Sequence, residues 1–202
     1  SKALDQVVGA RRITPAAEKL RRLMHYGQIL QSHALHFYHL SSPDLLFGFD
    51  APVAIRNIVG VLQAYPDAAK RGVLLRKFGQ EVIRVTAGKR VHGTGSVPGG
   101  VNKCLTAEER DLLVASLPDV LRWAEDGIAL VAELHGAHRE AWDRFGTVRS
   151  NLLSIVRRDG ALDLYDGVIR ARDADGHIIV DGIEPTAYGE LIRENVRSWS
   201  YM

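Results

Sequence analysis

Three of the chain's eight histidines are concentrated in one segment, Gln31–Leu40, which reads Gln-Ser-His-Ala-Leu-His-Phe-Tyr-His-Leu. Imidazole can donate or accept a hydrogen bond, bind a metal ion or transfer a proton near neutral pH. At about 100° per residue of an α-helix, Ser32, His36 and His39 lie within an arc of roughly 60°, beside the apolar face. The spacing therefore predicts a polar stripe along one side of a largely buried helix.

The residues alone leave two interpretations of this stripe. In the first, each imidazole packs its ring in the core and donates its N–H to a backbone carbonyl. In the second, His36 and His39 bind a metal ion, but no carboxylate or thiolate shares their spacing, and the metal interpretation is disfavoured.

A second unusual segment is the loop 88–101, which contains five glycines and one histidine, His92. Glycine lets the backbone take conformations closed to other residues and lets another surface approach closely. A phosphate-binding loop is disfavoured, because that motif needs Lys-Ser or Lys-Thr after its last glycine and this chain continues Val101-Asn102-Lys103-Cys104. The loop is either a contact surface or a solvated turn carrying Lys89, Arg90 and His92.

In this order and at this separation, the two segments resemble the large, catalytic subunit of nickel-iron hydrogenases, most closely the cytoplasmic NAD-reducing group. His-x-x-His-Phe-Tyr matches the family helix that passes beside the metal pocket. Gly-Lys-x-x-His followed by Pro-Gly-Gly-Val matches the family loop that meets the small subunit. The segments 46–52 and 78–82 resemble the NAD-linked group in particular. The resemblance covers most of the chain and is strongest from Thr14 to Asn102.

The resemblance implies roles for individual residues. Ser32 stands where the family commonly has Asp in the polar canopy over the open metal site, with His33 and His36 as its neighbours. A hydroxyl can order a water molecule there but cannot act as a carboxylate base. His92 matches a histidine near the proximal iron-sulfur cluster of the partner subunit, where an N–H donor would tune the cluster's potential. The implied interface residues are Gly88, Lys89, Arg90, Gly93, Pro98, Gly99 and Gly100.

The implied activity is reversible oxidation of dihydrogen at a nickel-iron centre with cyanide and carbonyl ligands. The implied partners are the small iron-sulfur subunit and the diaphorase subunits, which hold the iron-sulfur clusters, FMN and NAD. That family binds its metals with two Cys-x-x-Cys motifs, one near each end of the subunit, whereas this chain has a single cysteine, Cys104. We therefore expect a central segment of the subunit, typical of an excised piece, that binds no metal or other cofactor and is inactive alone.

Two alternatives remain open. A metal-free relative, such as the quinone-site subunit of respiratory complex I, could keep the helical scaffold without the metal centre. Alternatively, a helical protein-interaction domain could use the glycine loop as an interface with no redox role. Paired cysteines in the sequence on both sides would favour the hydrogenase, and absence of a neighbouring iron-sulfur subunit gene would favour the interaction domain.

The composition narrows the function classes. The 202 residues include 26 Lys and Arg against 24 Asp and Glu, and a net charge of +2 gives no global field for nucleic acid or an anionic membrane. A single cysteine excludes an internal disulfide framework. No signal peptide opens the chain and no apolar run approaches the ~20 residues that span a bilayer. The sequence predicts a soluble, cytoplasmic protein.

Helix signals dominate the first 146 residues. Thr14-Pro15 and the capping box that starts at Thr106 are strong helix starts. Predicted helices run over about 15–40, 52–62, 67–86, 106–115 and 118–145. Beyond Gly146, apolar runs at 164–172 and 177–180 flank Asp173–Gly176, a hairpin signal, and a short helix is expected from 185 to 196. The predicted fold is mainly α, a bundle of long helices (1–146) with a small β-hairpin annex (147–202), in the α+β class.

Overall fold

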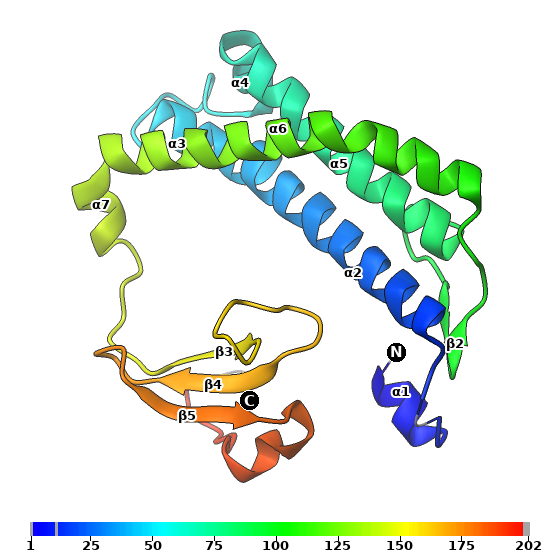
Figure 1. Ribbon diagram of the computed structural model, residues 1–202. Coiled ribbons are helices and arrows are strands. Elements are labelled where there is room, and N and C mark those ends of the chain that lie inside the picture. The colour runs from blue at the N-terminus through cyan, green and yellow to red at the C-terminus, as the bar shows by residue number, and fades with distance from the viewer. Residues whose placement is uncertain (1, 11, 200–202) are drawn as a thin grey trace. The chain divides into compact units, whose positions relative to one another are not determined.

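The computed structural model describes residues 2–10 and 12–199, and these are mainly helical with two small antiparallel sheets (Figure 1). The predicted α+β class is confirmed. Contacts divide the chain into two compact units, Ser1–Trp142 and Asp143–Met202. The domain boundary that the sequence predicts after residue 146 stays a prediction. None of the described helices is both long and apolar enough to cross a membrane.

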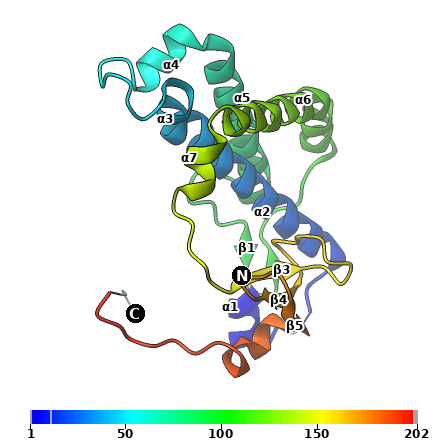
Figure 2. The same cartoon turned by 90° about the vertical axis from the view of Figure 1, so that its left-hand side faces the viewer.

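Three long helices build the first unit, α2 (Pro15–Leu35), α5 (Pro66–Ala87) and α6 (Ala107–Ala137). Helices α2 and α5 lie side by side, and α6 packs on α5 (Figure 1 and Figure 2). Both predicted strong starts are confirmed, because the Thr14 hydroxyl accepts from the Ala17 amide and Thr106 forms a capping box with Glu109. The core residues are Ala34, Tyr38, Leu75, Val82, Val85, Leu113 and Val120.

Glycines allow α2 and α5 to approach closely. A β-carbon added at Gly79 would lie 2.7 Å from the Gly27 carbonyl oxygen and 2.7 Å from Cβ of Gln31. A β-carbon at Gly27 would lie 2.6 Å from Cγ1 of Val82. Side chains larger than hydrogen would force the two helices apart, and the contact between them therefore depends on both glycines.

The predicted end of the histidine helix at about residue 40 is wrong. Helix α2 continues as a π-helical segment, His36–Ser41, and then as α3 (Ser42–Phe47). Pro43 lies in the first turn of α3, where a missing N–H breaks no helical hydrogen bond. The Ser42 hydroxyl donates to the Tyr38 carbonyl at 2.6 Å, which ties the two segments together.

Two other predicted boundaries are also wrong. Helix α4 (Ile58–Ala64) begins six residues later than expected, because the Asn57 side chain accepts from the amides of Val59 and Gly60. Helix α6 runs through Pro118 instead of breaking there, and α7 (Arg139–Arg144) follows it. The buried residues Leu113 and Val120 lie on either side of the proline, and this packing offsets the loss of one helical hydrogen bond.

Helix α6 carries a second apolar stripe, whose members are exposed. The stripe repeats at intervals of three, four and seven residues, which places its members on one side of the helix. Its most exposed members, Leu121 and Ile128, have 59% and 71% of their surface open. The members are Val114, Leu117, Leu121, Ile128 and Val131. An apolar surface of this length is typical of a contact with further protein.

The second unit is a three-stranded antiparallel sheet in the order β3 (Leu152–Val156), β4 (Val168–Arg172) and β5 (Ile178–Ile183). The predicted hairpin is confirmed as β4 and β5, with the Asp173 carboxylate accepting from the amides of Asp175 and His177 in the turn. Strand β3 was not predicted, because its partner β4 lies about a dozen residues further on. The predicted helix to residue 196 is only a 3-10 turn, Pro185–Glu190.

Candidate functional site

The glycine loop begins where α5 ends and is closed by a small hairpin. Gly88 ends α5 in the left-handed conformation, with φ of 80°. Residues 88–94 are exposed. The loop then forms β1 (Ser96–Val97) and β2 (Gly100–Val101), two short antiparallel strands joined through Pro98 and Gly99. The predicted interface residues therefore fall into two groups, an exposed arc at 88–93 and a hairpin turn at 98–100.

His92 lies at the exposed arc of this loop. Its φ of 52° places it in the left-handed region, which side chains other than glycine seldom adopt. Among the described residues it is the one non-glycine residue with positive φ. A backbone held in this way at an exposed position is the kind of strain that recurs at functional sites.

The two basic residues of the arc differ in their surroundings. Arg90 lies 3.3 Å from the Glu81 carboxylate, an exposed ion pair that ties the arc back to α5. Glu81 also accepts from Arg84 at 2.8 Å, and Arg84 first and then Arg90 hold the pKa of Glu81 below its usual range. Lys89 is exposed. A partner that binds at this arc would therefore contact one arginine, Arg90, that is already ion-paired within the chain.

The base of the loop rests on two residues that the sequence did not single out. Asp5, on α1 (Lys2–Val7), and Arg21, on α2, are 6% and 3% exposed and form a buried ion pair beside the hairpin. The hydrogen bonds from the Arg21 guanidinium and then from the Gly99 amide lower the pKa of Asp5 to about 2. This carboxylate is therefore charged at every pH near neutrality.

Acid should weaken the buried ion pair at the base of the loop. The pKa of Asp5 is lower in the folded chain than the value near 4 of an unfolded chain. Its contribution to the free energy of unfolding is therefore fully present above about pH 4 and is lost as the pH falls toward 2. Unfolding measured from about pH 5 to about pH 2 should show this loss, and Asp5→Asn should lack it. The same pH dependence in both proteins would contradict the assignment.

The predicted canopy residues lie elsewhere, on α2 and at the start of the π-helical segment. Ser32, His33 and His36 are exposed, and the His33 ring nitrogen Nδ1 lies 2.9 Å from the Ile29 carbonyl. The sequence predicted that this helix is largely buried, whereas the buried residues of α2 are Ala17, Arg21, Gly27 and Ala34. In the π-helical segment the buried residue is Tyr38, 4% exposed, whose ring packs against Gly72 and whose hydroxyl packs against Gly127.

The structure does not bring the canopy residues and the glycine loop together. Helices α2 and α5 are antiparallel, because Gly27 meets Gly79 whereas Tyr38, further along, meets Gly72. The loop at the end of α5 therefore lies near Arg21, about 16 Å along α2 from Ser32 at 1.5 Å per residue. The two predicted sites are separate surfaces of one helix pair.

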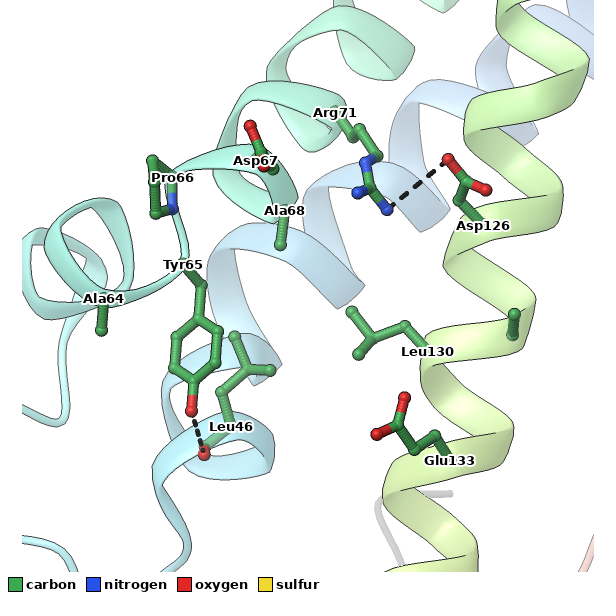
Figure 3. Close-up of a pocket in the computed structure, with 11 residues that line it drawn as sticks. Leu46, Ala64, Tyr65, Pro66, Asp67, Ala68, Arg71, Asp126, Leu130 and Glu133 are labelled. Carbon is green, nitrogen blue, oxygen red and sulfur yellow. Dashed lines mark hydrogen bonds and ion pairs between the residues drawn. The ribbon is translucent and has the colours of Figure 1, made fainter.

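A pocket of about 420 Å³ opens between the start of α5 and the C-terminal half of α6. Figure 3 shows Arg71 of α5 reaching toward Asp126 of α6, and the two charged groups lie 3.6 Å apart. The Tyr65 hydroxyl donates to the Leu46 carbonyl at 3.4 Å along the same wall. The pocket includes none of the predicted site residues.

The donor set of this segment does not fit a nickel-iron centre. Within residues 2–10 and 12–199, no three or more His, Cys, Asp or Glu side chains are grouped so that they could hold a metal ion. The single cysteine, Cys104, is exposed. A soft metal centre needs several thiolates, and this segment supplies one.

Comparison with known proteins identifies the relatives. No protein-family model matches the chain. It is 43% identical over 213 residues to the beta subunit of the NAD-reducing hydrogenase HoxS of Cupriavidus necator, covering 100% of this chain and 43% of that protein. It is 40% identical over 201 residues to one subunit of the F420-non-reducing hydrogenase vhu of Methanocaldococcus jannaschii, covering 100% of this chain and 47% of that protein.

A solved structure matches in both sequence and fold. The crystal structure of an NAD-reducing nickel-iron hydrogenase in the H2-reduced state is 49% identical, with a TM-score of 0.92, and the match covers 100% of this chain and 45% of that chain. The chain is related to the nickel-iron hydrogenase large subunit. A nickel-iron-selenium hydrogenase from Dm. baculatum, at 19% identity and a TM-score of 0.62, shows the fold alone and covers 83% of this chain.

The hydrogenase resemblance inferred from the histidine and glycine segments is thus confirmed. The chain spans less than half of the length of the hydrogenase subunits that it matches. The roles assigned to Ser32, His33, His36, His92 and the interface residues stay predictions.

Proposed function

We propose that this chain is the central part of the catalytic subunit of an NAD-linked nickel-iron hydrogenase. The intact complex would convert dihydrogen and NAD+ to a proton and NADH. The observation that carries the proposal is 49% identity at a TM-score of 0.92 to an NAD-reducing nickel-iron hydrogenase over the whole chain. Similarity at this level over all of the segment is hard to reconcile with an unrelated helical interaction domain.

Within the complex, the segment would supply scaffold and contact surfaces. The nickel-iron centre, when bound to ligands outside this segment, would supply the activation of dihydrogen. Ser32 would order a water molecule in the canopy over that centre, with His33 and His36 beside it. His92 would donate an N–H toward the proximal iron-sulfur cluster of the small subunit and favour its reduced form. The exposure of these side chains supports such contacts.

The partners that we propose are the small iron-sulfur subunit at the glycine loop and, beyond it, diaphorase subunits with FMN and NAD. The exposed apolar stripe on α6 supports a large assembly, because it needs a covering surface. We place the complex in the cytoplasm, by analogy with the NAD-reducing group that the sequence resembles.

The paired cysteines of the complete subunit test this function. We expect a Cys-x-x-Cys motif before residue 1 and another after residue 202, and we expect Cys→Ser in either motif to remove nickel from the purified subunit. A complete subunit without these pairs and without nickel would be a metal-free relative, and the proposed function would be wrong.

The 202-residue chain by itself should contain no stoichiometric nickel, iron or flavin and should take up no dihydrogen. The reason is the donor set, since one exposed thiol cannot replace four. Elemental analysis of the purified chain, with the complete subunit as the positive control, measures this. One nickel ion per isolated chain would overturn the assignment of the ligands to the flanking sequence.

A further inference from the structure

The hairpin that closes the glycine loop has little structure of its own. Strands β1 and β2 are two residues each, paired only as Ser96 with Val101 and Val97 with Gly100. Gly99 adopts a φ of 84° at the turn and has one neighbour near its side-chain position, Cβ of Ala10 at 3.8 Å. A ladder this short is marginal in water, and its shape must be held from outside.

Asp5 and Arg21 contact this turn with both donors and acceptors. The Arg21 guanidinium donates from Nη2 to the Val97 carbonyl at 2.8 Å, and from Nη2 and Nε to the Gly100 carbonyl at 2.8 and 3.1 Å. The Asp5 oxygen Oδ1 accepts from the Gly99 amide at 2.7 Å. Each of these bonds spans 76 to 94 residues of sequence.

The two side chains also hold each other. Arg21 donates from Nη1 to Oδ2 of Asp5 and from Nη2 to Oδ1 at 3.2 Å, a bidentate pair. Both residues are buried, and neither charge can be left unpaired there without a large desolvation cost. Asp5 therefore holds the Arg21 guanidinium in the orientation from which it donates to the turn.

We infer that Asp5 and Arg21 are a positioning pair that fixes the hairpin turn of the glycine loop in the shape that the partner subunit contacts, an inference that rests on the proposed function for the partner. The pair joins three elements, α1, α2 and the hairpin, at one buried point. Its directional hydrogen bonds to the turn, more than the attraction between its two charges, set the turn's shape.

Three variants of the complete subunit test whether the hydrogen bonds to the turn, or the attraction between the two charges, hold the turn in its shape. Arg21→Lys keeps the charge but loses the planar fork that reaches two carbonyls. Asp5→Asn keeps an oxygen for the Gly99 amide and removes the charge. The double variant Asp5→Arg with Arg21→Asp restores opposite charges but exchanges the positions of donor and acceptor, so that a carboxylate stands where the guanidinium donates to the Val97 and Gly100 carbonyls. Arg122→Lys, which alters an exposed ion pair with Asp119 at 2.7 Å on α6, is the matched control.

Two readouts separate the turn from the fold and from the partner. Hydrogen exchange of the Gly99 and Asn102 amides reports the turn, and exchange of the Val82 and Val85 amides reports the core of α5. Titration with the small iron-sulfur subunit reports the contact. Arg21→Lys and the charge swap should speed exchange of the turn amides by about tenfold or more with the α5 amides unchanged. The dissociation constant for the small subunit should rise by about the same factor, and Arg122→Lys should change neither.

Each outcome decides one claim. Protection of the turn in Arg21→Lys equal to that of the original subunit would mean that charge alone suffices and would overturn the inference. Turn amides that exchange faster while partner affinity is unchanged would overturn the positioning role. If Arg21→Lys also unfolds α5, Asp5→Asn becomes the deciding variant. We expect Asp5→Asn to speed exchange of the turn amides by a smaller factor, and unchanged exchange would count against the role of the pair. If the unsubstituted subunit does not bind the small iron-sulfur subunit, the proposed function fails. The exchange data would still test whether Asp5 and Arg21 hold the turn in its shape.

Discussion

Leucine in place of His92 should lower dihydrogen-dependent NAD reduction by the complete enzyme by roughly tenfold or more, with hydrogen–deuterium exchange at the metal close to its original rate. The exchange reaction needs only the nickel-iron pocket. NAD reduction must also pass the proximal cluster, whose environment His92 is proposed to polarise. The two activities should therefore separate when they are measured on one purified preparation.

The backbone of His92 requires a matched control. Its φ of 52° strains leucine more than histidine, and part of any loss could come from the loop's shape. His92→Gly adopts that conformation freely and also lacks the imidazole. Both variants should show the same loss if the ring is responsible, whereas activity kept by His92→Gly would assign the loss to strain.

Ser32→Ala should show the opposite pattern, with hydrogen–deuterium exchange affected and electron transfer to NAD unaffected in itself. The proposed place of Ser32 is in the canopy over the metals, and losing one hydroxyl-bound water should cost about 0.5–1.5 kcal/mol.

One result for His92 would contradict its proposed role. If His92→Leu lowers both activities in parallel with the nickel content, the glycine loop is a structural or maturation element, and the role of His92 in electron transfer is wrong.

Alanine at Gly79 should lower the free energy of unfolding of the chain by about 1–3 kcal/mol or more. The added carbon would lie 2.7 Å from a backbone oxygen of α2, and backbone at a helix contact cannot move aside as a flexible side chain can. Helices α2 and α5 would have to separate along their whole contact. Chemical denaturation of the chain measures the change.

Gly136→Ala is the control for that substitution. Gly136 lies in α6 with nothing within 4 Å of its side-chain position. Alanine there should raise the free energy of unfolding by up to about 1 kcal/mol, through helix propensity alone. Equal effects of the two substitutions, in sign and size, would show that the helix contact at Gly79 is looser than described.

Local signals in the sequence predicted local structure well. The capping box at Thr106, the start at Thr14-Pro15 and the Asp173 turn each involve residues within four positions of one another, and all three are present. The failures involve distant partners. Pro118 has the sequence signal of a break, but packing of its helix on α5 overrides that signal.

Prediction of the candidate site from the sequence was limited in the same way, to residues that are close to one another along the chain. Motif spacing located the histidine and glycine segments and indicated the right family, because those residues are close in sequence. The Asp5–Arg21 pair was missed, since its contacts with the turn span 76 to 94 residues. One signal could have found Arg21, which follows the buried Ala17 by four positions and so shares its side of α2. A basic residue at a buried helix position indicates a paired charge.

The most direct test of the central claim is an assay of the complete complex, purified under anaerobic conditions from cells grown with and without nickel. We predict that dihydrogen will reduce NAD+ to NADH in the nickel-containing complex, and that omission of either dihydrogen or nickel will abolish the reaction. A correctly assembled, nickel-replete complex that forms no NADH and exchanges no hydrogen with deuterium would contradict the account.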